Sequence, residues 1–215
     1  MAEARIVLIR HGETEWNRAG RIQGYHADSS LTQTGREQVR ALAGRLTREG
    51  IDVVYSSDAG RTRETAQPIA AATRLPIVFD KALRERNYGV FEGYSFTEIE
   101  TVFAAEYATF RTRDPHYAPP DGESAAQFRD RILGALGAIA GRSNGRRVAV
   151  VTHGGVLGVI YRMAMNIPLE EKRSYVLANA SLNCFRFADG RWLLDAWADT
   201  AHLSAESPVV DPGTA

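Results

Sequence analysis

Two of the five histidines in this chain stand in the same setting, just after a short apolar run and directly before a glycine. His11 follows the apolar run 6–9 (IVLI) and Arg10, and His153 follows the apolar run 148–151 (VAVV) and Thr152. Apolar, β-branched runs of this length are typical of strands buried on both faces of a parallel sheet. If the two strands are neighbours, about 5 Å apart, both imidazoles can reach one small ligand, which the glycine backbone can approach closely.

Two arginines are placed to add positive charge beside these histidines. Arg10 precedes His11, and its guanidinium is costly to bury unless an anion meets it. Arg61 falls in the first turn of a predicted helix, where backbone N–H groups also favour an anion. Taken alone, Arg61 is more simply explained as a solvated residue, as we expect for Arg63. Together the two arginines and two histidines would trap an anion, and phosphate is the obvious one.

Positive charge around His11 has a chemical consequence. It disfavours the protonated imidazole, so His11 should be neutral near pH 7 and present a lone pair to phosphorus. Attack would give a phosphohistidine and split one difficult reaction into two easier steps. We expect Arg10, Arg61 and His153 to hold the charge on the transferring oxygens, so that catalysis is mainly positioning and electrostatics.

The leaving group of such a reaction needs a proton. Glu85, in the segment 83–89 (LRERNYG), is our candidate for the general acid and later for the base that activates water. On physical grounds alone Glu92 is an equal rival, and both assignments stay open at this point.

The order of predicted elements positions these residues. Strands are predicted at 6–9, 53–55, 76–79 and 147–152. Helices are predicted from 31 until Gly50, from Ser57 or Asp58 to 73, from Asp121 or Ser124 to 145, and at 156–165. A hairpin joins 181–187 to 191–197 through Asp189-Gly190. This pattern predicts a three-layer α/β/α sandwich with a mostly parallel central sheet and one antiparallel edge hairpin. Ligands of such sheets bind beyond the carboxyl ends of the strands.

We expect a single domain over residues 1–203. The segment at about 94–122 mixes short amphipathic helices with proline-rich loops and should form a small irregular cap or rim over the site. Residues 204–215 are small, polar or proline-flanked, and they are predicted to be a disordered tail.

Composition excludes several function classes. The 26 basic and 26 acidic side chains cancel, so no electrostatic footprint for nucleic acid or an anionic membrane is expected. One cysteine excludes an internal disulfide, and His26, His116 and His202 show no metal-ligand spacing, so neither a metal nor a cofactor is expected. With no signal peptide and no membrane-spanning run, we expect a cytoplasmic protein. Its expected partner is a small-molecule phosphomonoester, and a homodimer is left open.

Six segments, in order, resemble one known family. They are 10–17 (RHGETEWN), 21–24 (RIQG), 31–35 (LTQTG), 56–66 (SSDAGRTRETA), 85–93 (ERNYGVFEG) and 152–155 (THGG). Each is weak alone, but the combination is similar to the histidine phosphatase superfamily, also called phosphoglycerate mutase-like, and it covers about residues 5–200.

The resemblance implies roles for individual residues. It makes His11 the phosphorylated nucleophile and Glu85 the proton donor, and it assigns phosphate binding to Arg61 rather than Arg63. The implied site comprises catalytic His11, Glu85, His153, Arg10 and Arg61; phosphate-binding Arg10, Asn17, Arg61, His153 and Gly154; and substrate-binding Gln23, Gly24 and Tyr88.

The family contains phosphatases and mutases. The interval between Glu85 and His153 is shorter than in cofactor-dependent mutases, and residues 120–124 (PDGES) resemble the phosphatase branch. Arg111 and Arg113 keep a phosphoglycerate mutase open as the alternative, because basic rim residues could grip a carboxylate. A catalytically silent phosphate-binding module is a distant alternative. A dinucleotide site is disfavoured because residues 154–158 (GGVLG) do not form G-x-G-x-x-G.

Overall fold

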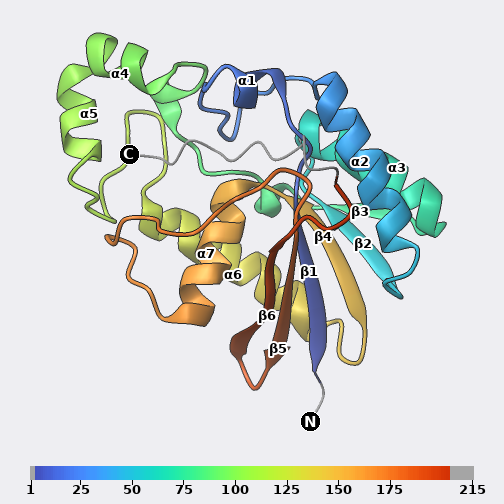
Figure 1. Cartoon of the computed structure of the whole chain (residues 1–215). Coiled ribbons are helices and arrows are strands. Elements are labelled where there is room, and N and C mark those ends of the chain that lie inside the picture. The colour runs from blue at the N-terminus through green and yellow to red at the C-terminus, as the bar shows by residue number, and fades with distance from the viewer. Residues whose placement is uncertain (1–2, 204–215) are drawn as a thin grey trace.

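The central sheet has six strands in the order β3-β2-β4-β1-β5-β6 in this computed structural model, which describes residues 3–203 (Figure 1). β1 pairs in parallel with β4, β4 with β2 and β2 with β3, whereas β5 is antiparallel to β1 and β6 to β5. The predicted mostly parallel sheet with an antiparallel hairpin at one edge is confirmed. The strands are β1 (Ala4–Arg10), β2 (Val53–Ser56), β3 (Ile77–Phe79), β4 (Arg147–Thr152), β5 (Leu182–Ala188) and β6 (Arg191–Asp199).

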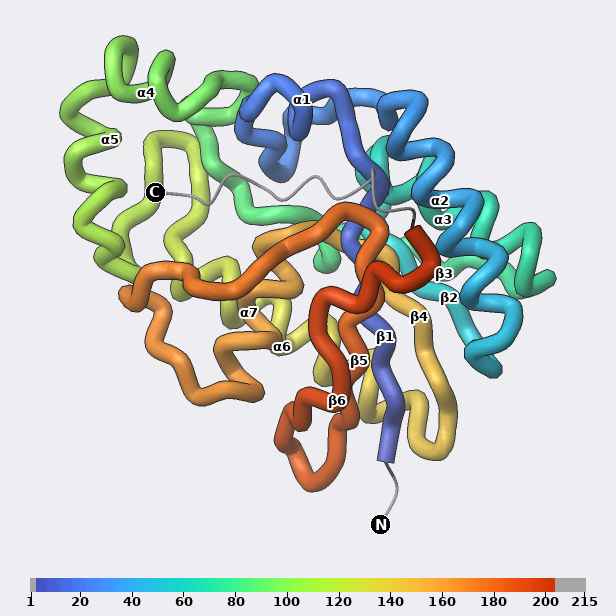
Figure 2. The backbone as a smooth tube through the Cα atoms, in the orientation of Figure 1, coloured from blue at the N-terminus to red at the C-terminus, as the bar shows by residue number. Residues whose placement is uncertain are grey.

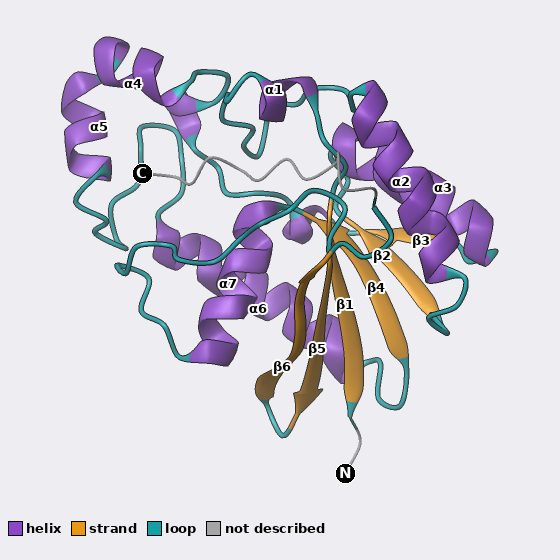
Figure 3. Ribbon diagram, in the orientation of Figure 1, coloured by secondary structure: helices purple, strands orange, loops and turns teal. Residues whose placement is uncertain are grey.

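Helices cover both faces of this sheet, as the predicted three-layer sandwich requires (Figure 3). Helices α2 and α3 lie on one face and α6 and α7 on the other, while α1, α4 and α5 lie beyond the end of the sheet where β1 stops (Figure 1). The helices are α1 (Glu15–Arg18), α2 (Gln33–Leu46), α3 (Gly60–Thr73), α4 (Phe96–Val102), α5 (Ala104–Phe110), α6 (Ala125–Gly141) and α7 (Gly154–Met165), with 3₁₀ turns at Lys81–Leu83 and Gly89–Phe91.

The apolar run of β1 is continuous because both of its faces are buried. Ala4, Ile6 and Leu8 belong to the core shared with α6 and α7, whereas Val7 and Ile9 belong to the core shared with α2 and α3. This alternation follows from the two-residue period of a strand. Each fully buried aliphatic side chain contributes about 1.5–3 kcal/mol, so the strand that ends at the site is firmly anchored.

The cap has a small core of its own. Ile22, Phe91, Ile99 and Tyr107 form a third buried cluster beneath α4 and α5. Arg21 forms two hydrogen bonds of 2.8 Å with the carboxylate of Glu98, which ties the segment after α1 to α4. The segment 94–122 therefore contains short helices, as predicted, and they are packed on a core rather than being an irregular rim.

The predicted start of α3 was wrong. Ser57 or Asp58 was expected to cap this helix, but it begins after Ala59, which makes no side-chain cap. Both predicted caps have other partners: Ser57 pairs with the ring of His153, and Asp58 accepts two hydrogen bonds from Arg84. Tertiary contacts have overridden a local preference here.

Two other predicted boundaries agree with the structure. Ser124, one of two candidate caps, begins α6 and forms a reciprocal capping box with Gln127. The β5–β6 hairpin turns at Asp189 and Gly190, whose φ values are 51° and 74°. Two consecutive positive φ angles are what the Asp-Gly sequence predicts for a tight hairpin.

The predicted tail, 204–215, lies outside the described residues, so the boundary at residue 203 stays a prediction. Within residues 3–203 no helix is both long and apolar enough to span a membrane.

A close backbone contact fixes the loop after β1 against the start of α2. Thr32 caps α2 through the N–H of Gly35, and the backbone N–H of Thr32 donates to the carbonyl of Glu13 at 2.9 Å. A Cβ atom at Gly35 would lie 2.1 Å from that same carbonyl oxygen. The loop that carries His11 can reach its place only if residue 35 has no side chain.

We predict that Gly35→Ala lowers the free energy of unfolding by about 1–3 kcal/mol, because the backbone of Glu13 must move. Gly44→Ala is the matched control, since Gly44 is exposed in the same helix and a Cβ atom there would have nothing within 4 Å. That substitution should stabilise by up to about 1 kcal/mol. Urea unfolding of both variants measures the difference, and equal effects would contradict the role of close packing at Gly35.

Candidate active site

His11 and His153 lie side by side at the end of the sheet. Arg10 and Thr152 are register partners in the parallel β1–β4 ladder, so the two histidines follow at the same level. Their ring centroids are 5.6 Å apart at an interplanar angle of 63°. Only 3% of His11 and none of His153 is exposed. Two imidazoles that are far apart in the sequence therefore share one buried location.

The hydrogen bond of His11 identifies its reactive nitrogen. Nδ1 lies 2.8 Å from the carbonyl oxygen of Gly12, which can only accept, so Nδ1 carries the proton and Nε2 keeps its lone pair. Burial holds the pKa of His11 well below its usual value, and the charges of Arg61 and Arg10 lower it further. A neutral His11 was expected from the neighbouring charge, but burial is the larger cause.

His153 is oriented by Ser57, a residue that follows β2. The Oγ of Ser57 lies 2.9 Å from Nε2 of His153. Burial, followed by the charges of Arg61, His11 and Arg10, holds the pKa of His153 well below its usual value. Nδ1 of His153 and Nε of Arg61 are buried and have no hydrogen-bond partner among the described residues. An oxyanion bound here would satisfy both groups.

Two guanidinium groups are buried beside the imidazoles. Arg10 donates to the carbonyl of Leu177 at 2.6 Å. Leu177 belongs to the segment between α7 and β5, which passes over this end of the sheet (Figure 2). Arg61 donates to Asp28 at 2.9 Å and to the carbonyl of Gly24 at 3.0 Å. Both arginines line the same pocket as His11. The structure thus brings together the four positively charged or imidazole side chains that the sequence placed in one site.

Arg63, the neighbour used for contrast, is exposed. Its guanidinium lies 4.0 Å above the ring of Phe79, and its Nε donates to the carbonyl of Asp58. Its placement agrees with the choice of Arg61 over Arg63.

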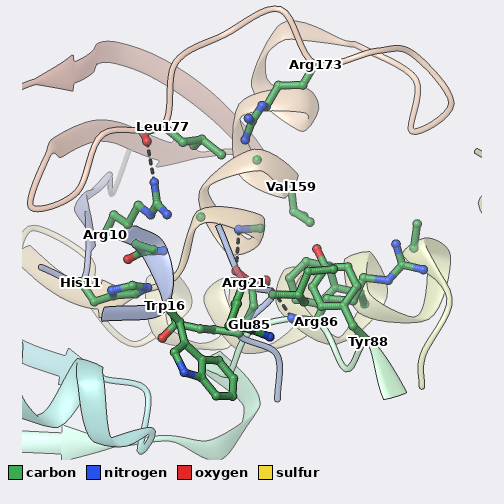
Figure 4. A pocket seen from close by; sticks show the side chains of 18 of the residues that line it. Arg10, His11, Trp16, Arg21, Glu85, Arg86, Tyr88, Val159, Arg173 and Leu177 are labelled. Carbon is green, nitrogen blue, oxygen red and sulfur yellow. Dashed lines mark hydrogen bonds between the residues drawn. The ribbon is translucent and has the colours of Figure 1, made fainter. Parts of the chain in front are cut away.

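Glu85 is a buried carboxyl group in the wall of this pocket (Figure 4). Its Oε2 accepts the N–H of Gly155 and its Oε1 accepts the N–H of Arg86, both at 2.8 Å. Burial raises the pKa of Glu85, and these two N–H groups, with Arg61 and Arg10, oppose the rise. A carboxyl group with a raised pKa is suited to donate and recover a proton.

Glu92, the rival candidate, is occupied by the backbone. Its two carboxylate oxygens accept the N–H groups of Tyr25, His26, Ala27 and Tyr88 at 2.7–3.1 Å. It does not belong to the pocket wall. The carboxylate of Glu92 is therefore a clamp between two loops, and Glu85 is the acid available to a ligand.

Asn17 and Gly154, both expected to bind phosphate, line the pocket. Oδ1 of Asn17 accepts hydrogen bonds from the N–H of Thr14 and from Nδ2 of Asn179, which fixes the orientation of its amide. Gly154 is the first residue of α7, so the N-terminus of that helix opens at the site. Such an arrangement favours an anion.

The three residues expected to face the rest of the substrate differ in position. Gln23 and Tyr88 line the pocket, and Gln23 is held there by its 2.7 Å hydrogen bond to Thr14. Gly24 does not line it. Its carbonyl instead accepts from Arg61, and a Cβ there would lie 1.9 Å from Oε1 of Glu92. Gly24 is thus placed to support Arg61.

Sequence reasoning missed several residues that hold the site. Ser57 could have been found, because β2 lies beside β4 and the residue after its end must lie near His153. Asp28, Leu177 and Asn179 carried no such signal, because they lie in irregular segments whose path only the folded chain defines.

Within residues 3–203, no group of three or more His, Cys, Asp or Glu side chains is arranged to hold a metal ion.

The chain is similar to known proteins over most of its length. The chain is 42% identical over 203 residues to metal-independent phosphoserine phosphatase from Arabidopsis thaliana, covering 93% of this chain and 83% of that protein. It is 41% identical over 204 residues to phosphoglycerate mutase-like protein 4 of the same plant, covering 93% and 87%. The solved structure of Bacillus stearothermophilus YhfR superposes with a TM-score of 0.84 at 33% identity, covering 93% and 98%.

The model of one family matches nearly the whole described chain. It is the model of the histidine phosphatase superfamily, branch 1, and it matches residues 6–200. This range contains the paired histidines, both buried arginines and Glu85. The chain belongs to branch 1 of the histidine phosphatase superfamily.

Proposed function

We propose that this protein hydrolyses small-molecule phosphomonoesters through a phosphohistidine on Nε2 of His11. The observation that carries the proposal is the pair of buried rings 5.6 Å apart. Of the two, His11 lines a pocket together with Arg10, Arg61 and the buried carboxyl group of Glu85, and His153 lies buried beside it. A tetrahedral dianion would be met there by positive charge and by a neutral nucleophile.

The first step transfers the phosphoryl group to the protein. Nε2 of His11 attacks phosphorus as the bond to the leaving oxygen breaks, and that oxygen takes a proton from Glu85. Arg10, Arg61 and His153 stabilise the charge on the three other oxygens. Because Nδ1 of His11 stays bonded to the carbonyl of Gly12, the ring does not have to rotate during attack.

The second step returns the protein to its starting state. The carboxylate of Glu85 takes a proton from water while the water oxygen attacks phosphorus. The P–N bond breaks, its electron pair returns to Nε2 of His11, and inorganic phosphate leaves. Glu85 is then protonated again, as its buried environment favours.

Hydrolysis is better supported than isomerisation. The two rim arginines that kept the mutase alternative open do not line the pocket of His11. Arg111 is exposed and lies 3.7 Å from Glu100, while Arg113 lines an adjoining outer hollow that shares part of its wall with the pocket. One relative is named a phosphoserine phosphatase and another a phosphoglycerate mutase-like protein, so the assay must score free phosphate and isomerised product separately.

We predict that His11→Ala lowers kcat on p-nitrophenyl phosphate at least about 10³-fold, the scale seen when a nucleophile is removed. The matched control is His116→Ala, because His116 is exposed in the cap and outside the pocket wall. Circular dichroism should show both variants folded. Substantial hydrolysis by a folded His11→Ala protein would refute the proposal.

Glu85→Gln should separate substrates by their leaving groups. We predict a loss of about 10²–10⁴ in kcat/KM for alkyl phosphates, whose alkoxide needs a proton, and a smaller loss for p-nitrophenyl phosphate. The comparison uses kcat/KM because this constant reports phosphoryl transfer to His11 and not the later hydrolysis. Equal losses on both substrates would argue against proton donation.

Glu85→Gln also tests how kcat/KM for alkyl phosphates depends on pH. His11 is neutral above a pKa well below 6.5, and Glu85 must be protonated, with a pKa above its ordinary 4.5. For alkyl phosphates kcat/KM should therefore fall as pH rises through the pKa of Glu85. This alkaline decline should be absent from Glu85→Gln, and its persistence would assign it to another group.

A further inference from the structure

The motif 120–124 (PDGES) lies outside the pocket wall, yet it packs on the part of the chain that carries Glu85. A Cβ atom at Gly122 would lie 2.8 Å from the carbonyl oxygen of Asn87. The backbone N–H of Glu123 donates to that same carbonyl at 2.9 Å, and Oε1 of Glu123 accepts the N–H of Asn87 at 2.9 Å. The motif is therefore fastened to the backbone two residues after Glu85.

Arg131, near the start of α6, makes five hydrogen bonds, one for each N–H donor of a guanidinium. Nη1 donates to the carbonyls of Ala82 and Arg84, both at 2.9 Å, and Nη2 donates to the carbonyl of Glu85 at 3.1 Å. Nη2 and Nε also donate to the carboxylate of Glu123. The rigid fork of one side chain thus joins three backbone carbonyls to the carboxylate of the motif.

The carboxyl group of Glu85 is closely fitted to the start of α7. Its Oε2 accepts the N–H of Gly155 at 2.8 Å, and a Cβ atom at residue 155 would lie 2.1 Å from its Oε1. The hydroxyl of Thr152, beside His153, donates to the carbonyl of Leu83 at 2.9 Å. A shift of this backbone would move the carboxyl group away from the leaving oxygen, and a misplacement of about 1 Å can cost about 10²-fold in rate.

The Glu123–Arg131 pair acts from outside the pocket. Neither residue lines the pocket wall, and their side chains are 17% and 21% exposed. A partly buried ion pair adds little stability by itself, because its attraction largely offsets the solvation that the two charges lose. Its bonds end on the backbone that carries the acid, so its effect on geometry falls on Glu85.

We propose that Glu123 and Arg131 are positioning residues, which hold the backbone of residues 82–87 so that the carboxyl group of Glu85 reaches the leaving oxygen of the substrate. This inference rests on the proposed function and deepens it, since it makes proton donation depend on two residues that do not touch the substrate.

The test compares an alkyl phosphate with p-nitrophenyl phosphate. The alkyl phosphate is whichever of glycerol 3-phosphate, phosphoethanolamine and phosphoserine the unmodified protein hydrolyses fastest. The quotient of the two kcat/KM values, alkyl over p-nitrophenyl, is called the leaving-group ratio below. It does not depend on the fraction of folded protein, because that fraction scales both values equally.

Arg131→Gln should lower the leaving-group ratio at least about tenfold, because an alkoxide needs the proton of Glu85 far more than p-nitrophenolate does. The charge of Arg131 also contributes to lowering the pKa of His153. An effect through His153 would act on the phosphoryl oxygens of both substrates and leave the ratio unchanged. An unchanged ratio would therefore overturn the positioning role.

A milder variant tests whether charge alone is sufficient. Arg131→Lys keeps the positive charge, but one ammonium group cannot span three carbonyls and a carboxylate as the planar fork does. We expect this variant to lower the leaving-group ratio as well. Full retention of the ratio in Arg131→Lys would contradict positioning by the fork.

The acid itself supplies a second test. In a protein that already carries Glu85→Gln, Arg131→Gln should change the leaving-group ratio by less than about twofold, because no acid is left to position. The same selective loss in that background would show that Arg131 acts through another group, and it would overturn the inference.

Arg129→Gln is the matched control. Arg129 belongs to the same helix, is bonded to the neighbouring Asp130 and lies outside the pocket wall. Its leaving-group ratio should match that of the unmodified protein. A loss as large as that of Arg131→Gln would mean that any change on α6 disturbs the acid, which would contradict a specific role for the Glu123–Arg131 pair.

Failure of this inference can be told from failure of the proposed function. Hydrolysis of both substrates with one leaving-group ratio in every Arg131 variant would overturn the positioning role and leave phosphomonoester hydrolysis standing. If the unmodified protein releases no phosphate from any of the alkyl phosphates, the proposed function fails instead.

Discussion

The parallel register of β1 and β4 is the constraint on which the site depends. Because Arg10 is paired with Thr152, the residues that follow both strands leave the sheet together, and His11 and His153 must meet. The two cores on either side of the sheet hold this register, since slipping one strand by a residue would turn its apolar side chains to the wrong face. The packing of the sheet between its two cores therefore determines that His11 and His153 lie together.

Burial gives these groups their chemical character. The same exclusion of water that lowers the pKa of both imidazoles raises that of Glu85. The result is a neutral nucleophile and a carboxyl group suited to hold a proton, placed beside two permanent cations, Arg10 and Arg61. Such a set is poorly matched to a neutral ligand, because its buried charge is balanced best by a dianion. Electrostatics therefore selects the phosphoryl group.

Much of this could be predicted from sequence because strands and strand-end motifs are local signals. Two His-Gly pairs after buried runs were sufficient to predict that the imidazoles converge. The choice between Glu85 and Glu92 could not be made that way, since it depends on which carboxylate the loop backbone occupies. Local reasoning also failed for Ser57, which was one of two candidate caps for α3 but lies against the ring of His153.

The most direct test of covalent catalysis is to stop the reaction in alkali within milliseconds and map the phosphate on the chain. With ³²P-labelled p-nitrophenyl phosphate, we predict base-stable, acid-labile label on the peptide that contains residue 11, with phosphorus on Nε2. Nδ1 is excluded because its proton is bonded to the carbonyl of Gly12. Label on another residue, or turnover without any labelled protein, would contradict a role for His11 as the nucleophile.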